Sequence, residues 1–347
     1  MSNLQIGLAV AGGLVLVAVV AHGAWTSRKN APKQPLPENR QEEPSLDAHE
    51  PSLDGEGVDD IRPLTLPAAP KRPAMDSLID VIASVSLDSA VGVVSGEAAI
   101  AAMPSTRRAG TKPFAIEGLN AESNVWEVPH PGQRYSSFQA GVQLANRSGA
   151  LNEIEYSEFV VKTQAFADAI GATPEFPEML DEVARARELD QFASAHDAQL
   201  GFAIRALHAA WSPGYVHQNA ARLGFIAGSI PGRMVLPARA DGLPPVLVLS
   251  FDSQAALAED PAQSAIRALA LHLDVAQVDR AERAFERMRE SAKGLALAMD
   301  GVVTDDNGQS LPEQTMEVIG TELETLYVTM EQRDLAAGSP LARRLFS

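Results

Sequence analysis

Three short stretches contain residue types that could perform chemistry, but none has the spacing that the chemistry requires. Segment 228–232 (GSIPG) places a serine among glycines, yet the glycines do not fall at the positions of the Gly-x-Ser-x-Gly turn of serine hydrolases. Segment 305–308 (DDNG) offers two carboxylates without the downstream ligands of a calcium loop. We interpret the first as a strand kink and the second as a tight turn. His208 and His217 could approach one another, but two imidazoles lack a third metal ligand.

The composition excludes several further classes of function. The chain contains no cysteine, so it has no thiol nucleophile, thiolate metal site or disulfide framework. A P-loop, a dinucleotide-binding glycine fingerprint and a His-Glu-x-x-His motif are also missing from the sequence. The formal net charge of −17, from 45 acidic and 28 basic residues, argues against binding to nucleic acid. We therefore expect a protein that is not an enzyme, carries no cofactor or metal and binds no nucleic acid.

The N-terminal segment 4–24 is apolar and contains no Asp, Glu, Lys or Arg. As a helix it would be roughly 31 Å long, which matches the hydrocarbon thickness of a bilayer. Trp25, Arg28 and Lys29 follow it as an interfacial aromatic residue and a positive stop would. A cleaved signal peptide is the alternative, but residues 1–3 carry no basic side chain. The sequence predicts a transmembrane anchor over 1–27, with the rest of the chain on the cytoplasmic side.

Residues 28–75 form a segment rich in proline and acidic side chains. Such a composition cannot bury enough apolar surface to offset the entropy of ordering, so the sequence predicts a disordered linker. The linker contains a repeat, in which the sequence EPSLD of 43–47 recurs at 50–54. A docking motif and drift within a low-complexity segment are both open interpretations of this repeat.

The remaining sequence predicts two related α+β units, at 76–198 and 199–335, followed by a flexible tail at 336–347. Apolar residues alternate along 79–87 as in a strand, and they recur at three and four residues along 152–170 as in a helix. The order strand, helix, three strands and two helices occurs twice, which indicates two copies of one unit. We expect each unit to be a mostly antiparallel sheet with helices packed on one face.

An open sheet face in the second unit is the strongest candidate for a binding site. The strands predicted at 246–251 and 265–275 alternate leucines with smaller residues, and the leucines should face the helices. The outward side chains would then be Val248, Ser250, Ala268, Ala270 and His272, with Ile230 beside them. This shallow trough suits a peptide better than a small substrate. A face that is merely covered by a loop or by the other unit is the open alternative.

Residues 22–29 (HGAWTSRK), 224–230 (GFIAGSI) and 301–306 (GVVTDD) form three motifs. These motifs resemble those of the ZipA family of membrane-anchored bacterial cell-division proteins, which bind the C-terminal tail of FtsZ. Residues 22–29 (HGAWTSRK) resemble the family's HGFWTSRK, and residues 224–230 (GFIAGSI) are similar to its GFIFGDM. Residues 301–306 (GVVTDD) are similar to GVVLDD, which precedes the last helix of the family domain. The order of anchor, proline-rich linker and C-terminal α+β domain also resembles the family.

The resemblance implies that the FtsZ tail lies across the exposed sheet face of the second unit and is held by apolar contacts. Ile230 stands where the family has a methionine, Ser250 where it has an alanine and His272 where it has a phenylalanine. Either Arg205 or Ala206 takes the place of a valine. These replacements make the trough more polar than in the family.

The resulting expectation is a cell-division protein that tethers FtsZ filaments to the inner membrane and stabilises the Z ring. Its partners would be the FtsZ tail, the bilayer through residues 4–24, and other division proteins. It would cross the inner membrane once at the division septum, with a periplasmic N-terminus and a cytoplasmic C-terminal domain. The alternative is a membrane-anchored binding or sensor module for another cell-envelope partner, which would use 76–198 or the interface between the copies.

Overall fold

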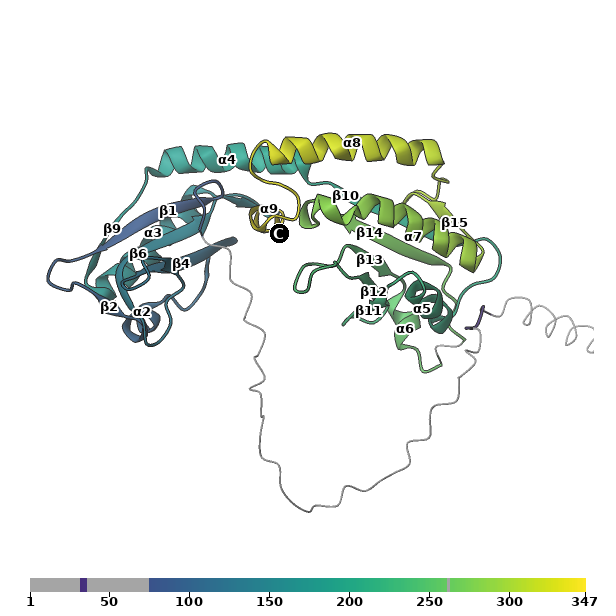
Figure 1. Cartoon of the computed structure of the whole chain (residues 1–347), viewed down its shortest axis with the longest axis horizontal. Helices are drawn as coiled ribbons and strands as arrows, with labels where there is room; N and C mark the ends of the chain where they lie inside the picture. The colour runs from purple at the N-terminus through teal and green to yellow at the C-terminus, as the bar shows by residue number, and fades with distance from the viewer. Residues whose placement is uncertain (1–31, 36–74, 261–262) are drawn as a thin grey trace, which may run out of the picture. The chain divides into compact units, whose positions relative to one another are not determined.

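The computed structural model describes residues 32–35, 75–260 and 263–347. They form two compact units, and each unit is built around one antiparallel sheet (Figure 1). Of the described residues, the first-sheet unit contains 75–200, Leu273–Arg287 and Pro312–Ser347, and the second-sheet unit contains 32–35, 201–260, 263–272 and Met288–Leu311.

The units are interleaved in sequence, which differs from the two contiguous segments that the sequence predicts. Along 75–260, the chain passes from the first-sheet unit to the second-sheet unit at Leu200–Gly201, close to the expected boundary. Later residues then return to the first-sheet unit because they pack against it. The Val275 N–H donates to the Ala198 carbonyl at 3.1 Å, and the Arg333 guanidinium lies 4.6 Å from the centre of the Phe192 ring.

The first sheet has the strand order β3-β4-β6-β1-β9. Its strands are β1 (Asp80–Leu87), β3 (Arg108–Ala109), β4 (Lys112–Asn120), β6 (Arg134–Gln143) and β9 (Ala172–Glu175). Two short strands pair at its margins, β2 (Val94–Ser95) with β6 and β5 (Trp126–Glu127) with β4, while β7 (Ala145–Asn146) and β8 (Gly149–Ala150) form a separate hairpin. The helices of this unit are α2 (Gly96–Ala102), α3 (Glu153–Ile170), α4 (Met179–His196), α8 (Glu313–Glu331) and α9 (Pro340–Leu345), with the 3-10 turns η2 (Val275–Gln277) and η3 (Arg280–Glu282).

Helix α3 covers one face of the first sheet. The alternating residues Val81, Ala83 and Val85 of β1 are fully buried on that face, as the sequence predicts. The rings of Phe138 in β6 and Phe166 in α3 meet edge to face with centroids 5.3 Å apart. This contact ties the sheet to the helix and leaves the other sheet face, here called the outer face, without α3.

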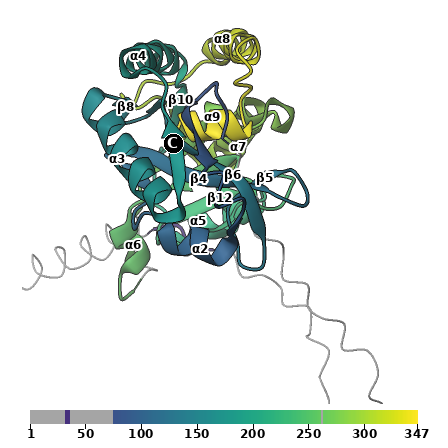
Figure 2. The same cartoon turned by 90° about the vertical axis from the view of Figure 1, so that its left-hand side faces the viewer.

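Helices α4 and α8 belong to the same unit, and Figure 2 shows them end-on, next to one another.

Helix α3 begins with a capping box in which the Asn152 side chain accepts N–H bonds while Glu155 reaches back to the Asn152 backbone. The N-cap of α8 is Pro312, which makes no side-chain capping hydrogen bond.

The C-terminal residues are folded, so the expected flexible tail at 336–347 is corrected. Helix α9 buries Leu345 completely and Phe346 to 1 % exposure. The Arg344 guanidinium binds both carboxylate oxygens of Asp80, with 2.9 Å between Nη1 and Oδ2. Gln143 also donates to the Arg344 carbonyl at 2.9 Å. These contacts make the last residues of the chain part of the first sheet's support.

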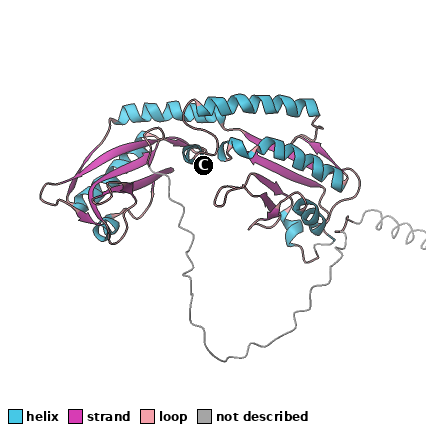
Figure 3. Ribbon diagram, viewed as in Figure 1, coloured by secondary structure: helices cyan, strands magenta, loops and turns pink. Residues whose placement is uncertain are grey.

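The second sheet has the strand order β11-β12-β13-β14-β10-β15. Figure 3 draws the strands of both sheets in magenta. Its strands are β10 (Gln199–Ala206), β11 (Ile226–Ala227), β12 (Arg233–Leu236), β13 (Leu247–Ser250), β14 (Ala268–Asp274) and β15 (Gly301–Thr304). The helices near it in sequence are α5 (Pro213–Ala221), α6 (Ser253–Leu257) and α7 (Ala284–Met299). Segment 228–232 is the turn of the β11–β12 hairpin, not a kink within one strand, because Gly232 takes φ +75° and reverses the chain.

The two sheets share a topology. Strand β1 lies between β6 and β9, and β10 lies between β14 and β15. In both units a long helix precedes the last strand, α3 before β9 and α7 before β15, with one left-handed residue between helix and strand. The left-handed residue is Gly171 in the first and Asp300 in the second. This correspondence fits the predicted duplication, whose common origin stays a prediction.

The predicted anchor at 1–27 lies outside the described residues, and so does most of the predicted linker. No helix within the described ranges is both long and apolar enough to cross a bilayer. Residues 32–35 of the linker are described and correct the expectation of disorder at that point. Lys33 forms a parallel bridge with Trp211, donating its N–H to the Ala210 carbonyl at 2.7 Å and accepting the Ser212 N–H at 3.0 Å.

Candidate peptide-binding face

The face of the second sheet opposite to the buried Leu247, Leu249 and Leu271 is here called its outer face. It carries one continuous row of side chains across four strands. Ile226 lies opposite Val235, Val235 opposite Val248, and Val248 opposite His272. Residues directly opposite one another in an antiparallel ladder point to the same face of the sheet. Ile226 is 55 % exposed at one end of the row and His272 is exposed at the other. The row therefore runs from an aliphatic end to a polar end.

A second row of smaller residues runs beside the first. Arg233 lies opposite Ser250, and Ser250 lies opposite Ala270. Ala268 occupies the next outward position of β14, two residues before Ala270. The intervening Leu249 is completely buried on the opposite face. The structure thus brings five predicted residues together on one face: Val248, Ser250, Ala268, Ala270 and His272.

The polar end of the face is formed where β14 meets β10. The position that a β-carbon would take at Gly201 lies 3.7 Å from His272 Nδ1 and 3.4 Å from Asp306 Oδ1. A glycine at this point leaves space between the imidazole and the carboxylate. Gly201 thus lies between His272 and the acidic side chain of Asp306.

The two candidates for the family's valine, Arg205 and Ala206, point to opposite faces of β10. Arg205 is exposed and lies opposite Val302 of β15, and its Nε donates to Thr304 Oγ1 at 3.3 Å. Ala206 comes next along β10 and so points to the other face. Arg205 therefore belongs to the outer face and Ala206 does not.

Ile230 does not lie on a strand of the face. It sits in the β11–β12 turn with 53 % of its surface exposed, and its carbonyl accepts the Arg233 N–H at 3.1 Å. The residues that sequence reasoning missed are Ile226 and Val235. The hairpin turn at 228–232 was the signal for them, because a turn there pairs 226–227 with 234–235.

The opposite face is supported by apolar packing. Met288, Ala292, Leu295 and Met299 of α7 are all completely buried, as their three-and-four spacing predicts. The His217 ring on α5 meets the Phe251 ring edge-on, with centroids 5.8 Å apart. Burial lowers the pKa of His217 below its ordinary value of 6.5.

The arrangement favours contact and not chemistry. Within the described parts of the chain, no cluster of three or more His, Asp or Glu side chains could hold a metal ion. His208 pairs with Asp300, with 3.0 Å between Nδ1 and Oδ2. A shallow sheet face with aliphatic, small and charged positions can hold an extended or helical peptide by apolar burial and a few polar contacts.

Residues 252–322 match the family model of the ZipA C-terminal FtsZ-binding domain. The matched segment contains β14, α7 and β15, and with them Ala268, Ala270 and His272 of the outer face. Comparison with curated proteins finds no match to the chain. The match confirms the resemblance to the ZipA family, in that residues 252–322 are similar to its C-terminal FtsZ-binding domain.

Proposed function

We propose that this chain acts in cell division by binding the C-terminal tail of FtsZ on the outer face of the second sheet. The observation that carries the proposal is the family match over 252–322 together with the position of β14. The outward residues of β14 lie inside the matched segment and line the candidate face. The protein is accordingly a binding protein and not an enzyme.

The two rows suggest how a tail peptide is held. Apolar side chains of the peptide would cover Ile226, Val235 and Val248, where removal of aliphatic surface from water is the main favourable term. His272 and Arg205 would contact polar or acidic groups of the peptide at the other end. Binding would thus combine a weaker apolar contact than the family's with a polar one.

Membrane attachment through residues 4–24 completes the proposal. An anchored module meets a membrane-associated filament at a high effective concentration, so a modest affinity for each tail suffices. Many tails on one filament would add to this effect. The chain would thereby link FtsZ filaments to the cytoplasmic side of the inner membrane at the septum.

The direct test is binding of a synthetic FtsZ tail peptide to the full chain in detergent or nanodiscs. Val248→Asp places a charge at the centre of the first row and should weaken binding at least tenfold, since an unpaired carboxylate resists burial. Val318→Asp is the matched control, because Val318 is exposed on α8, outside the face. If the two variants bind the peptide equally well, the FtsZ tail does not bind to this face.

Attachment is tested separately in cells. A fluorescent fusion that lacks residues 1–27 should leave midcell or become diffuse, whereas the intact fusion should mark the septum. A truncated fusion that keeps the membrane-bound septal pattern would refute the anchor without affecting the peptide-binding measurement.

A further inference from the structure

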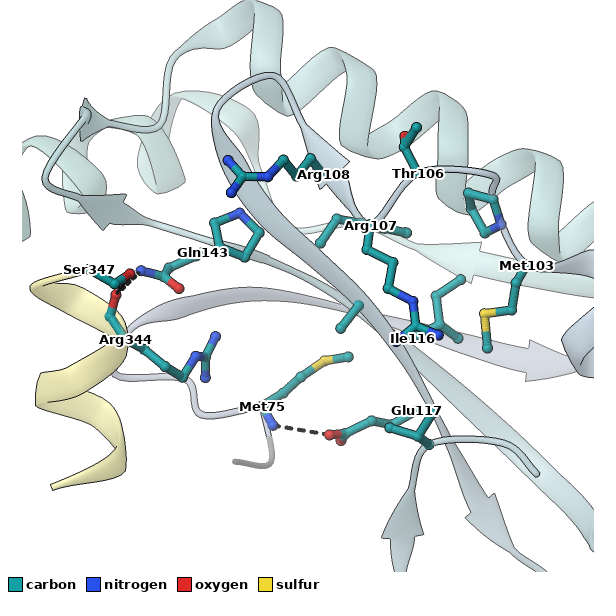
Figure 4. A pocket seen from close by; sticks show the side chains of 15 residues that line it. Met75, Met103, Thr106, Arg107, Arg108, Ile116, Glu117, Gln143, Arg344 and Ser347 are labelled. Carbon is teal, nitrogen blue, oxygen red and sulfur yellow. Dashed lines mark hydrogen bonds between the residues drawn. The ribbon is translucent and has the colours of Figure 1, made fainter. Parts of the chain in front are cut away.

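The first-sheet unit contains a cavity of about 390 Å³ on the outer side of β4 (Figure 4). The apolar residues that line it on this side come from four separate segments: Met75, Met103, Pro113 with Ala115, and Val128. This volume lies at the lower end of the range for sites that bind organic ligands. The cavity therefore has room for a few aliphatic side chains.

Met75 helps to build the cavity by lying across the outer face of the sheet. A β-carbon at Gly141 would come within 2.6 Å of the Met75 sulfur, so the glycine makes space for this side chain. The Met75 N–H also donates to Glu117 Oε1 at 3.3 Å. The chain therefore enters the first-sheet unit at the rim of the cavity.

The three arginines that line the cavity differ in the partners they have among the described residues. Arg108 donates to the Thr111 carbonyl at 3.1 Å, and Arg344 binds Asp80. Arg107 is exposed, and its guanidinium forms no hydrogen bond or ion pair with any residue that the structure describes. Figure 4 shows its side chain extending over β4 toward Ile116. The cavity thus pairs an apolar lining with an arginine that is available to a carboxylate.

Strand β4 offers backbone groups beside the same cavity. Its pairing with β3 stops at Pro113, and its pairing with β5 begins again at Gly118. In between, the Phe114 N–H donates to the Arg107 carbonyl at 3.0 Å, so Phe114 presents its backbone on the edge away from β6. Alternation places the N–H and carbonyl of Ile116 on that edge as well. An extended segment could bond to this edge.

The best ligand for these features is an extended peptide with an aliphatic residue between carboxylates. The repeated EPSLD sequence at 43–47 and 50–54 has this chemistry, with Leu46 and Leu53 each flanked by acidic residues. Asp54 and Met75 are joined by a segment that spans at most about 75 Å when fully extended. The repeats are therefore within reach of the cavity.

We propose that the EPSLD repeats of this chain are the intramolecular ligand of the cavity beside β4. A leucine enters the apolar lining, and a neighbouring carboxylate pairs with Arg107. Because the repeat is part of the same chain, its effective concentration is in the millimolar range and weak binding suffices. Two copies give the cavity two alternative ligands, which accounts for the repeat.

The absence of cysteine from the chain allows a clean disulfide-trapping test. Ala48→Cys places one thiol between the repeats in the full chain, and Ala115→Cys places the second in the cavity, where Ala115 is exposed. The matched control replaces Ala115→Cys by Val161→Cys. Val161 is 67 % exposed on α3, the helix that covers the opposite face.

Under mild oxidation the intrachain disulfide to position 115 should form at least tenfold faster than the disulfide to position 161. Arg107→Glu, or Leu46→Ala with Leu53→Ala, should reduce the first rate to the level of the second. Arg134→Glu reverses an exposed charge outside the cavity and should leave the rate unchanged. Equal rates at 115 and 161, or no effect of Arg107→Glu, would overturn the proposal. A disulfide that joins two chains would overturn the intramolecular assignment.

Discussion

His272 lies directly opposite Val248 in the β13–β14 ladder, and both side chains are on the outer face of the second sheet. The family resemblance places a phenylalanine at the position of His272. The first row therefore loses its aromatic end and keeps its aliphatic members. This pair marks the place where the face changes from apolar to polar.

Replacement of His272 by phenylalanine should restore the aromatic end and strengthen binding of the FtsZ tail peptide. The added apolar burial is worth about 1–2 kcal/mol, which corresponds to roughly 5- to 30-fold in affinity. Titration of the full-length variant with the labelled peptide measures the change. His208→Phe is the control, since His208 is exposed in another part of the unit. Weaker binding by His272→Phe would mean that the imidazole itself contacts the tail.

Ile226 and Ile230 form a natural pair for locating the apolar end of the face, because they are 55 % and 53 % exposed. Ile226→Asp should weaken tail binding about tenfold, since Ile226 belongs to the strand row. Ile230→Asp should change the affinity less than threefold, because Ile230 lies in the turn. The reverse order in the same titration would move the peptide from the strands to the hairpin turn.

Loss of the Arg344–Asp80 ion pair should destabilise the first-sheet unit. Asp80 is 2 % exposed, so Arg344→Ala leaves a buried carboxylate without its main partner, at a cost of about 3 kcal/mol in the free energy of unfolding. Urea denaturation followed by the near-ultraviolet signal of Tyr135 and Tyr156 in that unit measures it. Arg343→Ala, on the same short helix, should change the free energy by less than about 0.5 kcal/mol. Similar losses for both variants would point to α9 as a whole and not to the ion pair.

Acid should lower the free energy of unfolding of the second-sheet unit, and His217 should contribute to this loss. Burial lowers the pKa of this imidazole in the folded state, so the unfolded chain takes up a proton at higher pH than the folded chain does. The contribution of neutral His217 to the free energy of unfolding is complete above the ordinary pKa of 6.5 and is lost as the pH falls below it. His217→Gln should therefore lose less stability than the parent chain between pH 7 and pH 5 in urea titrations. Identical losses would show that the pKa of His217 is the same in the folded and the unfolded chain.

The backbone of Lys33 should matter more than its side chain for docking of residues 32–35. Lys33→Pro removes the N–H that bonds to the Ala210 carbonyl, and hydrogen exchange at the Ser212 amide should then accelerate at least tenfold. Lys33→Met keeps both backbone bonds and removes only the contacts of Nζ with Met299 and Asp300. It should change the exchange rate less than threefold. A large effect of Lys33→Met would assign the docking to the ammonium group.

Strand alternation and helix periodicity predict much of the fold. The buried residues of β1, α3 and α7 follow from spacing alone, because the side-chain period of each element is fixed by its backbone geometry. Strands β9 and β15 could not be predicted in this way. Each has only four residues, and β9 contains Pro174 while β15 begins with Gly301, so neither has the local pattern of a strand. Pairing with β1 and β10 stabilises them instead.

The residues of the candidate face can be predicted only in part, because strand alternation places some of them and the register of a hairpin places the others. Alternation along β13 and β14 places Val248, Ser250 and His272 outward without any knowledge of the neighbours. Ile226 and Val235 require the register of the β11–β12 hairpin, which depends on how 228–232 turns. The cavity beside β4 depends on contacts between Met75 and the distant Gly141, and no local pattern reports such contacts.

The bridge between Lys33 and Trp211 limits the distance between the proposed anchor and the second sheet. With the proposed anchor ending at Ala24, even a fully stretched chain from there to Lys33 covers only about 30 Å. The length of the acidic segment 36–74 therefore does not affect the distance between the bilayer and the second sheet. A filament bound to that sheet would therefore lie close to the lipid surface, at a nearly constant distance that does not depend on the length of the rest of the linker.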